Sequence, residues 1–278
     1  MVVTDLDGTL LDSRGKLSAR NYSMLTELGA QGVLRVVATG RNLHSARTAI
    51  APEMPIDYLV FASGAGTMSW PHGALLNARH LDASMAAQAA AQLIALGFDF
   101  MLHAAVPDNH HFWYHRASSG NADFERRIDR YQDFCQPLPQ AWPVQVPAGP
   151  FSQLLAVQSS GGALEYSAQH EQLRAQLAPL NVIRATSPLD HQSVWFEVFA
   201  AGVSKATAAQ WLLRHHGLPE SEVLAVGNDY NDEEMLSWAA HAKVVGNAPA
   251  ELRARYDSCA SNDADGFSDA VSAWLAPT

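Results

Sequence analysis

The sequence predicts an α/β protein, with a doubly wound parallel-sheet core and an inserted α+β module. Three observations predict this class. Short apolar runs alternate with helical segments at both ends of the chain, which is typical of a parallel sheet. In the middle, strands follow one another without helices between them, which indicates antiparallel pairing. The length of 278 residues allows a large core and a smaller second module.

The core strands are predicted from four runs of continuous apolar character, which indicates burial on both faces of a sheet. The first helix is predicted from a capping residue, Ser18, and a glycine stop near Gly32. Each of the four runs ends in small or polar residues, so polar side chains gather at the carboxyl ends of the strands. The runs cover residues 1–5, 33–41, 57–66 and 222–229.

The inserted module is predicted from the change of pattern in the middle of the chain. Helices are expected at 82–97, around 121–134 and at 167–179. Strands are expected at 98–106, 110–116, 152–159, 181–187 and 193–200, with a Pro-rich loop at 136–150. We place the module at residues 83–188, which leaves a discontinuous core of residues 1–82 and 189–278.

The composition excludes several classes of partner. A net charge of −10 argues against binding to a nucleic-acid backbone. Cys135 and Cys259 lie far apart and form no metal-binding or disulfide pattern, and no apolar run approaches the roughly 20 residues of a membrane helix. We therefore expect a cytoplasmic protein without a membrane partner, as a monomer or small homo-oligomer.

A pair of carboxylates, Asp5 and Asp7, ends the first apolar run in "VVTDLDGTLLD". Residues two apart in an extended segment face the same way, so both carboxylates can reach one site. Gly8 then permits a sharp turn or a close approach to a ligand. Asp and Gly after a strand also form simple turns, so this run alone leaves both interpretations open.

Other strand and helix ends carry groups that complement these carboxylates. Thr39 offers a hydroxyl and Gly40 a backbone N–H to an anion. Lys205 lies in the first turn of a helix that Ser204 is expected to cap, where an ammonium and the helix dipole both favour negative charge. The competing interpretations are a turn for Thr39 and Gly40, and a solvated surface position for the lysine.

An oxygen-rich loop follows the last buried strand in "LAVGNDYNDEEML". Carboxylate and amide oxygens suit a hard cation such as Mg²⁺, although an acidic helix N-terminus would also explain them. The residues concerned are Asn228, Asp229, Asn231 and Asp232.

Together these runs resemble the haloacid dehalogenase superfamily, and within it the Cof-like phosphatases with a C2-type (IIB) cap. "DLDGTLLD", "TGR", "GVSK" and "GNDYNDEEML" occur in that family's order and approximate spacing, and "GNAPAEL…SNDADGF" resembles its closing segment. The resemblance covers nearly the whole chain. It implies a Mg²⁺-dependent phosphatase acting through an aspartyl-phosphate.

The resemblance also implies a role for each matching residue. Asp5 is the expected nucleophile and Asp7 the general acid and base. Arg41 is an expected substrate contact. The expected phosphate ligands are Thr39, Gly40, Lys205 and Asn231, and the expected Mg²⁺ ligands are Asp5, the Asp7 carbonyl, Asn228, Asp229 and Asp232.

The chain departs from the family pattern at two positions. Asn228 stands where an Asp is common, so either its amide oxygen or the carboxylate of Asp229 is the expected metal ligand, and the sequence leaves this open. Ser63 stands where an Asn is common before Gly64 and Ala65.

The predicted substrate is a small phosphorylated metabolite, with sugar phosphates favoured. Two alternatives remain: phosphotransfer or phosphomutase chemistry through the same intermediate, and a non-catalytic protein that binds such metabolites. Four histidines in the module suggest a zinc site only weakly, because no Cys or carboxylate stands at a ligand spacing from them. They are His103, His110, His111 and His115.

Overall fold

A computed structural model describes residues 1–71, 73–117, 120–139, 149–158 and 162–276. The chain divides into two compact units. One, here called the core unit, consists of Met1–Ala78 and Ser204–Thr278; the other, the inserted unit, is Arg79–Val203. The expected Pro-rich loop falls largely on residues 140–148, outside the described part.

The core unit contains an eight-stranded sheet in the order β14-β13-β12-β1-β2-β3-β4-β5. β1 lies in the middle and pairs in parallel with β12 and β2. The pairs β3–β4 and β4–β5 are antiparallel, so this edge of the sheet departs from the predicted parallel order. The strands are β1 Val2–Thr4, β2 Arg35–Ala38, β3 Tyr58–Phe61, β4 Gly66–Ser69, β5 Leu75–Ala78, β12 Leu224–Gly227, β13 His241–Val244 and β14 Asp257–Ser258.

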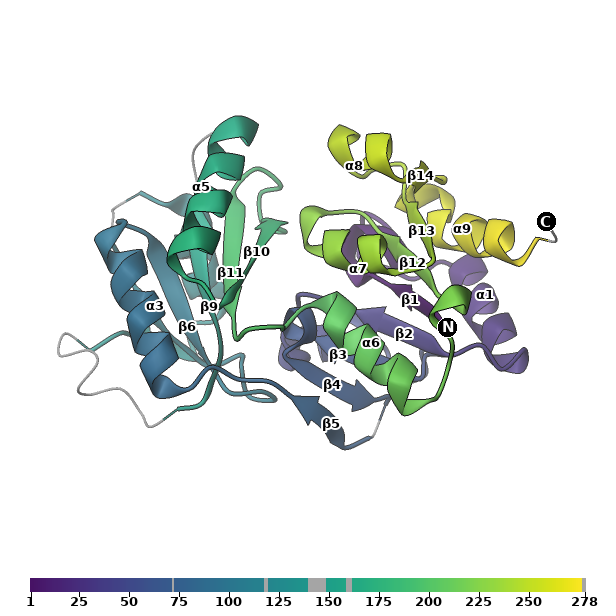
Figure 1. Ribbon diagram of the computed structural model, residues 1–278, viewed down its shortest axis with the longest axis horizontal. Coiled ribbons are helices and arrows are strands. Elements are labelled where there is room, and N and C mark those ends of the chain that lie inside the picture. Colours follow the sequence, from purple (N-terminus) through teal and green to yellow (C-terminus); the bar gives the residue numbers. More distant parts are fainter. Residues whose placement is uncertain (72, 118–119, 140–148, 159–161, 277–278) are drawn as a thin grey trace. The chain divides into compact units, whose positions relative to one another are not determined.

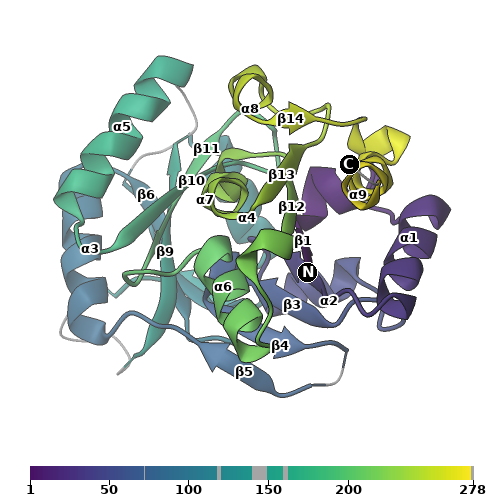
Figure 2. The ribbon, with the colours of Figure 1, turned by 45° about the vertical axis from the view of Figure 1, so that its right-hand side comes forward.

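Helices cover both faces of this sheet (Figures 1 and 2). α6 and α7 bury Leu212 and Met235 against Val3 and Val36 on one face, and α1 and α9 contact each other on the opposite side. Ser18 caps α1 as expected, since its side chain accepts a hydrogen bond from the Asn21 N–H at 3.0 Å. The helices are α1 Ala19–Ala30, α2 Leu43–Ala49, α6 Lys205–His215, α7 Glu233–Trp238, α8 Ala250–Arg255 and α9 Gly266–Leu275.

The inserted unit is built on a six-stranded sheet in the order β10-β11-β9-β6-β7-β8, antiparallel except for the β7–β8 pair. Alternate strand residues face opposite sides, so α3 and α5 pack on one face and α4 on the other. The elements are β6 Asp99–Ala104, β7 Phe112–His115, β8 Cys135–Pro137, β9 Phe151–Gln158, β10 Asn181–Thr186, β11 Val194–Phe199, α3 Ala83–Ala95, α4 Ala122–Arg130 and α5 Ala163–Gln176.

The later boundary of the inserted unit differs from the sequence-based expectation. A boundary at residue 188 would separate β10 from β11, yet these strands pair along their full length, and β11 also pairs with β9. All six residues of β11 are buried. The strand expected at 193–200 therefore belongs to the inserted unit, and the boundary follows it.

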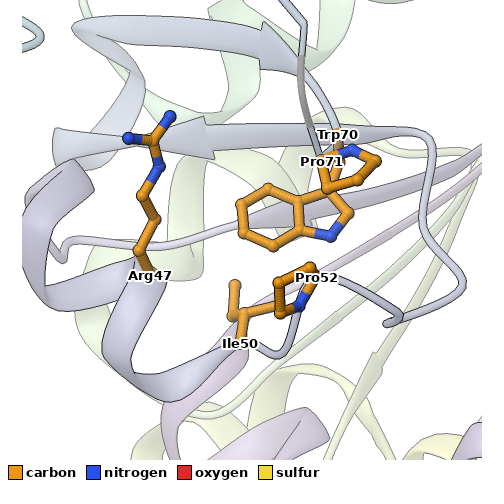
Figure 3. Close-up of a pocket in the computed structure, with 5 residues that line it drawn as sticks. All are labelled: Arg47, Ile50, Pro52, Trp70 and Pro71. Carbon is orange, nitrogen blue, oxygen red and sulfur yellow. The ribbon is translucent and has the colours of Figure 1, made fainter.

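A pocket of about 390 Å³ lies in the core unit (Figure 3). Its residues lie in the last turn of α2, just after α2 and just after β4, and β4 runs antiparallel to β3 with Ser69 opposite Tyr58. The pocket therefore lies at the amino ends of the parallel strands, whereas ligands of doubly wound sheets bind at the carboxyl ends. Its lining residues are Arg47, Ile50, Pro52, Trp70 and Pro71.

Candidate active site

The first carboxylate of the candidate site, Asp5, directly follows β1 in the centre of the sheet. Its N–H donates to the Val226 carbonyl at 2.9 Å, which extends the pairing between β1 and β12 by one residue. The chain then forms a wide loop, Leu6–Leu10, closed by a 2.9 Å hydrogen bond from the Leu11 N–H to the Leu6 carbonyl. Only 5% of the surface of Asp5 is exposed, so this carboxylate is buried.

Gly8 is required in this loop for two reasons. Its φ is +73°, a conformation that side chains disfavour. A Cβ atom on Gly8 would also lie 2.8 Å from the side-chain nitrogen of Asn228. The prediction of a sharp turn and a close approach at Gly8 agrees with this geometry.

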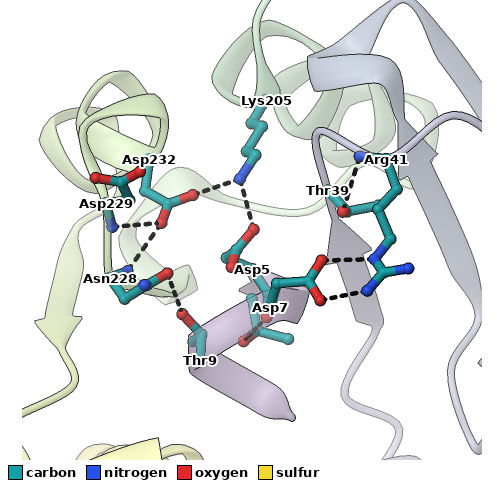
Figure 4. Close-up of polar contacts among 10 residues, drawn as sticks. Asp5, Asp7, Thr9, Thr39, Arg41, Lys205, Asn228, Asp229 and Asp232 are labelled. Atoms are coloured by element: carbon teal, nitrogen blue, oxygen red, sulfur yellow. Dashed lines mark hydrogen bonds and ion pairs between the residues drawn. The ribbon is translucent and has the colours of Figure 1, made fainter. Parts of the chain in front are cut away.

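The ammonium group of Lys205 lies between two carboxylates (Figure 4). Its Nζ donates to Asp5 Oδ1 and to Asp232 Oδ1, both at 2.6 Å. Ser204 caps α6 in a capping box with Thr207, as expected, and this fixes the first turn that carries Lys205. All three charged side chains are buried, and buried charges persist in proteins when they are paired in this way.

The charges in this cluster do not balance. Burial raises the pKa of Asp5, and the carboxylate of Asp232 raises it further, against the opposite effect of Lys205. Burial alone would lower the pKa of Lys205, but Asp232 and Asp5 together raise it above its usual value. One ammonium therefore faces two carboxylates, and an additional cation beside Asp5 would be favoured.

Three oxygen atoms converge on the side-chain amide of Asn228, which follows β12. In the orientation drawn in Figure 4, its oxygen accepts a hydrogen bond from Thr9 Oγ1 at 3.0 Å. With the amide turned end for end, its nitrogen donates to Asp5 Oδ2 at 3.3 Å, the Asp7 carbonyl at 3.1 Å and Thr9 Oγ1 at 3.0 Å. In the drawn orientation it is the amide oxygen that faces Asp5 Oδ2 and the Asp7 carbonyl, and these three hard oxygen donors are of the kind that Mg²⁺ requires.

The turn Tyr230–Asp232 is fixed by Asp232. Its Oδ2 accepts hydrogen bonds from the N–H groups of Asn228 at 2.8 Å and Asp229 at 3.1 Å. The same carboxylate therefore positions the loop with one oxygen and Lys205 with the other.

The second carboxylate, Asp7, is held by Arg41 (Figure 4). Nε of Arg41 donates to Asp7 Oδ2 and Nη2 donates to Asp7 Oδ1, both at 2.7 Å, in a bidentate pair. Nη1 of Arg41 donates to the carbonyl and hydroxyl oxygens of Ser45 at 3.2 and 3.0 Å. The Arg41 N–H donates to Thr39 Oγ1 at 3.1 Å. The direction of the Asp7 side chain is therefore set by two hydrogen bonds.

The family of the chain follows from comparison with known proteins. The model of the haloacid dehalogenase-like hydrolase family matches residues 2–271. The chain belongs to this family. The family predicted from the four motifs is thereby confirmed, and so is the prediction of a hydrolase. Phosphatases of this superfamily use a metal cofactor.

Individual relatives cover nearly the whole chain. Phosphatase YwpJ of Bacillus subtilis is 24% identical over 96% of each chain. The HMP-PP phosphatase of Serratia proteamaculans is 27% identical over 90% of this chain and 84% of its own. Among solved structures, the subclass IIB sugar phosphatase BT4131 has a TM-score of 0.72 and 19% identity, with 98% of each chain covered. This structural likeness supports the predicted fold class.

The other predicted site residues of this haloacid dehalogenase-like chain differ in their placement. Thr39 is buried at the end of β2, and Gly40 separates it from Arg41. Asn231 lies half-buried in the turn after β12. The carboxylate of Asp229 points away from Asp5 and Asp7 (Figure 4).

Three contacts of the site were not predicted from the sequence. Thr9 is buried against the Asn228 amide. Its position in "DLDGT", directly after the two carboxylates, is the sequence feature that could have indicated this contact. Ser45 holds Arg41, but the short helix α2 that carries it was not predicted. Asn247 donates to the Gly8 carbonyl at 2.8 Å, a contact across 239 residues of chain that no local pattern reveals.

No metal cluster of the usual acidic or histidine kind is found in the described ranges, where no three His, Cys, Asp or Glu side chains gather in a way that could hold an ion. The four histidines of the inserted unit therefore give no support for zinc. The candidate cation position near Asp5 depends instead on one carboxylate, one backbone carbonyl and one amide. Within the same described residues, no helix is both long and apolar enough to cross a membrane.

Proposed function

We propose that this chain is a Mg²⁺-dependent phosphatase that hydrolyses small phosphorylated metabolites through an aspartyl-phosphate at Asp5. The observation that carries the proposal is the environment of Asp5: one oxygen is paired with Lys205, and the other lies beside the Asp7 carbonyl and the Asn228 amide. A carboxylate held in this way presents an oxygen to an incoming phosphate. Family membership and the phosphatases among the relatives support the same reaction class.

We propose Asp5, the Asp7 carbonyl and Asn228 as the residues that hold Mg²⁺, with Asp232 behind them. Bound Mg²⁺ would offset the repulsion between the carboxylate of Asp5 and an anionic phosphate. Of the two alternatives at the start of the last motif, the geometry favours Asn228, because its amide contacts this group while Asp229 points away. The carboxylate of Asp232 is occupied by Lys205 and by two backbone N–H groups. It therefore orients the other groups.

The reaction has two halves. An oxygen of Asp5 attacks phosphorus, the bond from phosphorus to the leaving oxygen breaks, and Asp7 gives that oxygen a proton. In the second half Asp7 takes a proton from water, the water oxygen attacks phosphorus, and the bond to Asp5 breaks to release phosphate. Lys205, Thr39, Gly40 and Asn231 are proposed to hold the phosphate oxygens.

The role of Arg41 is proposed to differ from simple substrate binding. Its guanidinium donates to both Asp7 oxygens and to Ser45, so it orients Asp7 in this structure. Sugar phosphates remain the favoured substrates, since the structurally similar BT4131 is a sugar phosphatase. Location in the cytoplasm and a monomeric or small homo-oligomeric state stay predictions from the sequence.

The test is a panel of phosphorylated metabolites and p-nitrophenyl phosphate, assayed with Mg²⁺ and with a chelator. We expect phosphate release that requires Mg²⁺. The variant Asp5→Asn is expected to release no phosphate, while its circular dichroism spectrum stays the same as that of wild type. Release of phosphate without any added acceptor separates hydrolysis from phosphotransfer. Binding of phosphorylated metabolites without turnover of any of them would instead support the non-catalytic alternative.

A further inference from the structure

Three asparagine side chains hold the backbone carbonyls of the loop that follows Asp5. The side-chain nitrogen of Asn247 donates to the Gly8 carbonyl at 2.8 Å, that of Asn21 to the Leu10 carbonyl at 3.0 Å, and that of Asn262 to the Leu11 carbonyl at 3.0 Å. The loop is not regular secondary structure, so its carbonyls depend on such donors. None of these asparagines belongs to the proposed catalytic group.

The orientation of two of these amides, those of Asn247 and Asn21, is fixed from their other ends. The Asn262 N–H donates to Asn247 Oδ1 at 3.0 Å. Ser268 donates to Asn21 Oδ1 through its N–H at 3.2 Å and its hydroxyl at 2.7 Å. An amide whose oxygen already accepts a hydrogen bond can offer only its nitrogen to the loop. The segment 247–268 near the carboxyl end therefore fixes a loop near the amino end.

The contact of Asn247 lies next to the proposed metal ligands. Gly8 follows Asp7, whose carbonyl is one of the three oxygens around the Asn228 amide. Gly8 also lies so close to Asn228 that an added Cβ would be only 2.8 Å from its side-chain nitrogen. The Asn247 contact holds the peptide group that follows Gly8, and this group is joined to the peptide that carries the Asp7 carbonyl through the single Cα atom of Gly8.

We propose that Asn247 is a positioning residue for the cation, acting through the Gly8 carbonyl on the Asp7 carbonyl. This inference rests on the proposed function, because it assigns a residue to the support of the Mg²⁺ site. Groups that orient metal ligands typically change metal affinity or activity by about 10- to 100-fold when they are removed. Asn262 and Asn21 hold the far end of the loop, so they stabilise the loop without setting the Asp7 carbonyl.

The test compares Asn247→Ala with wild type in a calorimetric titration of the full chain with Mg²⁺ alone. Asn77→Ala, in β5 of the same unit, is the matched control. We expect Mg²⁺ to bind Asn247→Ala about tenfold or more weakly, and the control to bind as wild type does. Thermal unfolding without metal is expected to be similar in all three, because Asn247 is an exposed residue. The Mg²⁺ concentration for half-maximal hydrolysis of p-nitrophenyl phosphate should rise by the same factor.

Asn247→Ser provides a second variant, whose hydroxyl is too short to replace the amide, and the same weakening is expected. Binding of Mg²⁺ to both variants within twofold of wild type would overturn the inference while leaving the proposed function intact. A wild type that binds no Mg²⁺ would overturn the proposed metal site and this inference together. A fall in kcat/KM at saturating Mg²⁺ with unchanged affinity would also contradict it.

Discussion

Lys205 is the residue on which the charge balance of the site depends. Its side chain is buried, and its ammonium nitrogen lies 2.6 Å from a carboxylate oxygen of Asp5 and 2.6 Å from one of Asp232. Removing one partner of a buried ion pair leaves an uncompensated charge, which costs about 3–5 kcal/mol. The lysine is therefore expected to matter for stability as well as for binding phosphate.

We predict that Lys205→Met lowers the free energy of unfolding by about 3–5 kcal/mol and abolishes phosphatase activity. The double variant Lys205→Met, Asp232→Asn removes one of the stranded carboxylates, so part of the stability should return without activity. Urea denaturation and a phosphate-release assay measure the two effects. Equal stability of the single and double variants would show that the two carboxylates are not coupled through Lys205.

Arg41 sets the direction of Asp7, which gives a prediction about the leaving group. Alkyl phosphates need a proton donor for their leaving oxygen, whereas p-nitrophenolate leaves with little assistance. We predict that Arg41→Met lowers kcat/KM for an alkyl phosphate at least tenfold more than for p-nitrophenyl phosphate, within the range of about 10²–10⁴ for general acid catalysis.

Arg41→Lys is the control for this prediction. It keeps the positive charge but loses the planar two-point contact with Asp7, so an intermediate loss is expected. An equal fall in kcat/KM for both substrates in Arg41→Met would indicate that Arg41 binds the phosphate group and does not orient the acid.

At the scale of elements, the start of α6 is packed against the turn after β3. Gly64 has a φ of +109°, and a Cβ atom there would lie 2.2 Å from the backbone oxygen of Ser204. Ser204 caps the helix whose first residue is Lys205. The turn after β3 thus fixes the position of the ammonium group through backbone contact.

We predict that Gly64→Ala destabilises the protein by about 2–3 kcal/mol and reduces activity, because it strains the turn and displaces the first turn of α6. The matched control is Ala62→Gly, two residues earlier, where the existing φ of +48° suits glycine. Its stability should stay within about 1 kcal/mol of wild type. The measurement is urea denaturation, and a fully stable and active Gly64→Ala variant would disprove the close approach.

Elements differ in how far their sequences reveal them. β1, β2, β3 and β12 are continuous apolar runs and were predicted. β4 was missed because residues 57–66 were predicted as a single run, which overlooks the Ser63–Gly64 pair at the reversal, where Ser63 has a φ of +50°. α2 has only seven residues, too few for a clear helical period.

The site was predictable to the extent that topology decides it. The carboxyl ends of parallel strands meet at one edge of a sheet, so Asp5, Asp7 and Thr39 could be expected close together, with Lys205 and Asp232 near them. The partner of each side chain was not predictable. The Arg41–Asp7 pair and the Asn247–Gly8 contact depend on side-chain directions across 34 and 239 residues of chain.

At the scale of the whole molecule, one buried histidine links stability to pH. His103 lies in β6 of the inserted unit, where its Nδ1 is 2.7 Å from the Asn109 carbonyl and its Nε2 is buried with no hydrogen-bond partner among the described residues. Burial, aided by the nearby charge of Arg127, lowers the pKa of His103 to about 3. The folded chain therefore keeps this ring neutral in mildly acidic solution.

We predict that His103 contributes to loss of stability in acid. Because its folded pKa lies below the unfolded value of about 6.5, its contribution is complete above that pH and is lost as the pH falls toward 3. Between pH 7 and 5 wild type should lose about 2 kcal/mol more than His103→Leu. Chemical denaturation at the two pH values measures this difference. Identical pH dependence of the two proteins would mean that the folded chain accepts a proton at His103.

The central claim is that Asp5 attacks phosphorus, and its most direct test is to trap the covalent intermediate. The enzyme is mixed rapidly with radiolabelled substrate and Mg²⁺, quenched in acid within one turnover, and digested for mass spectrometry. The account predicts label on the peptide that contains Asp5 and none in Asp5→Asn. Label on another residue, or turnover that continues in Asp5→Asn, would contradict it.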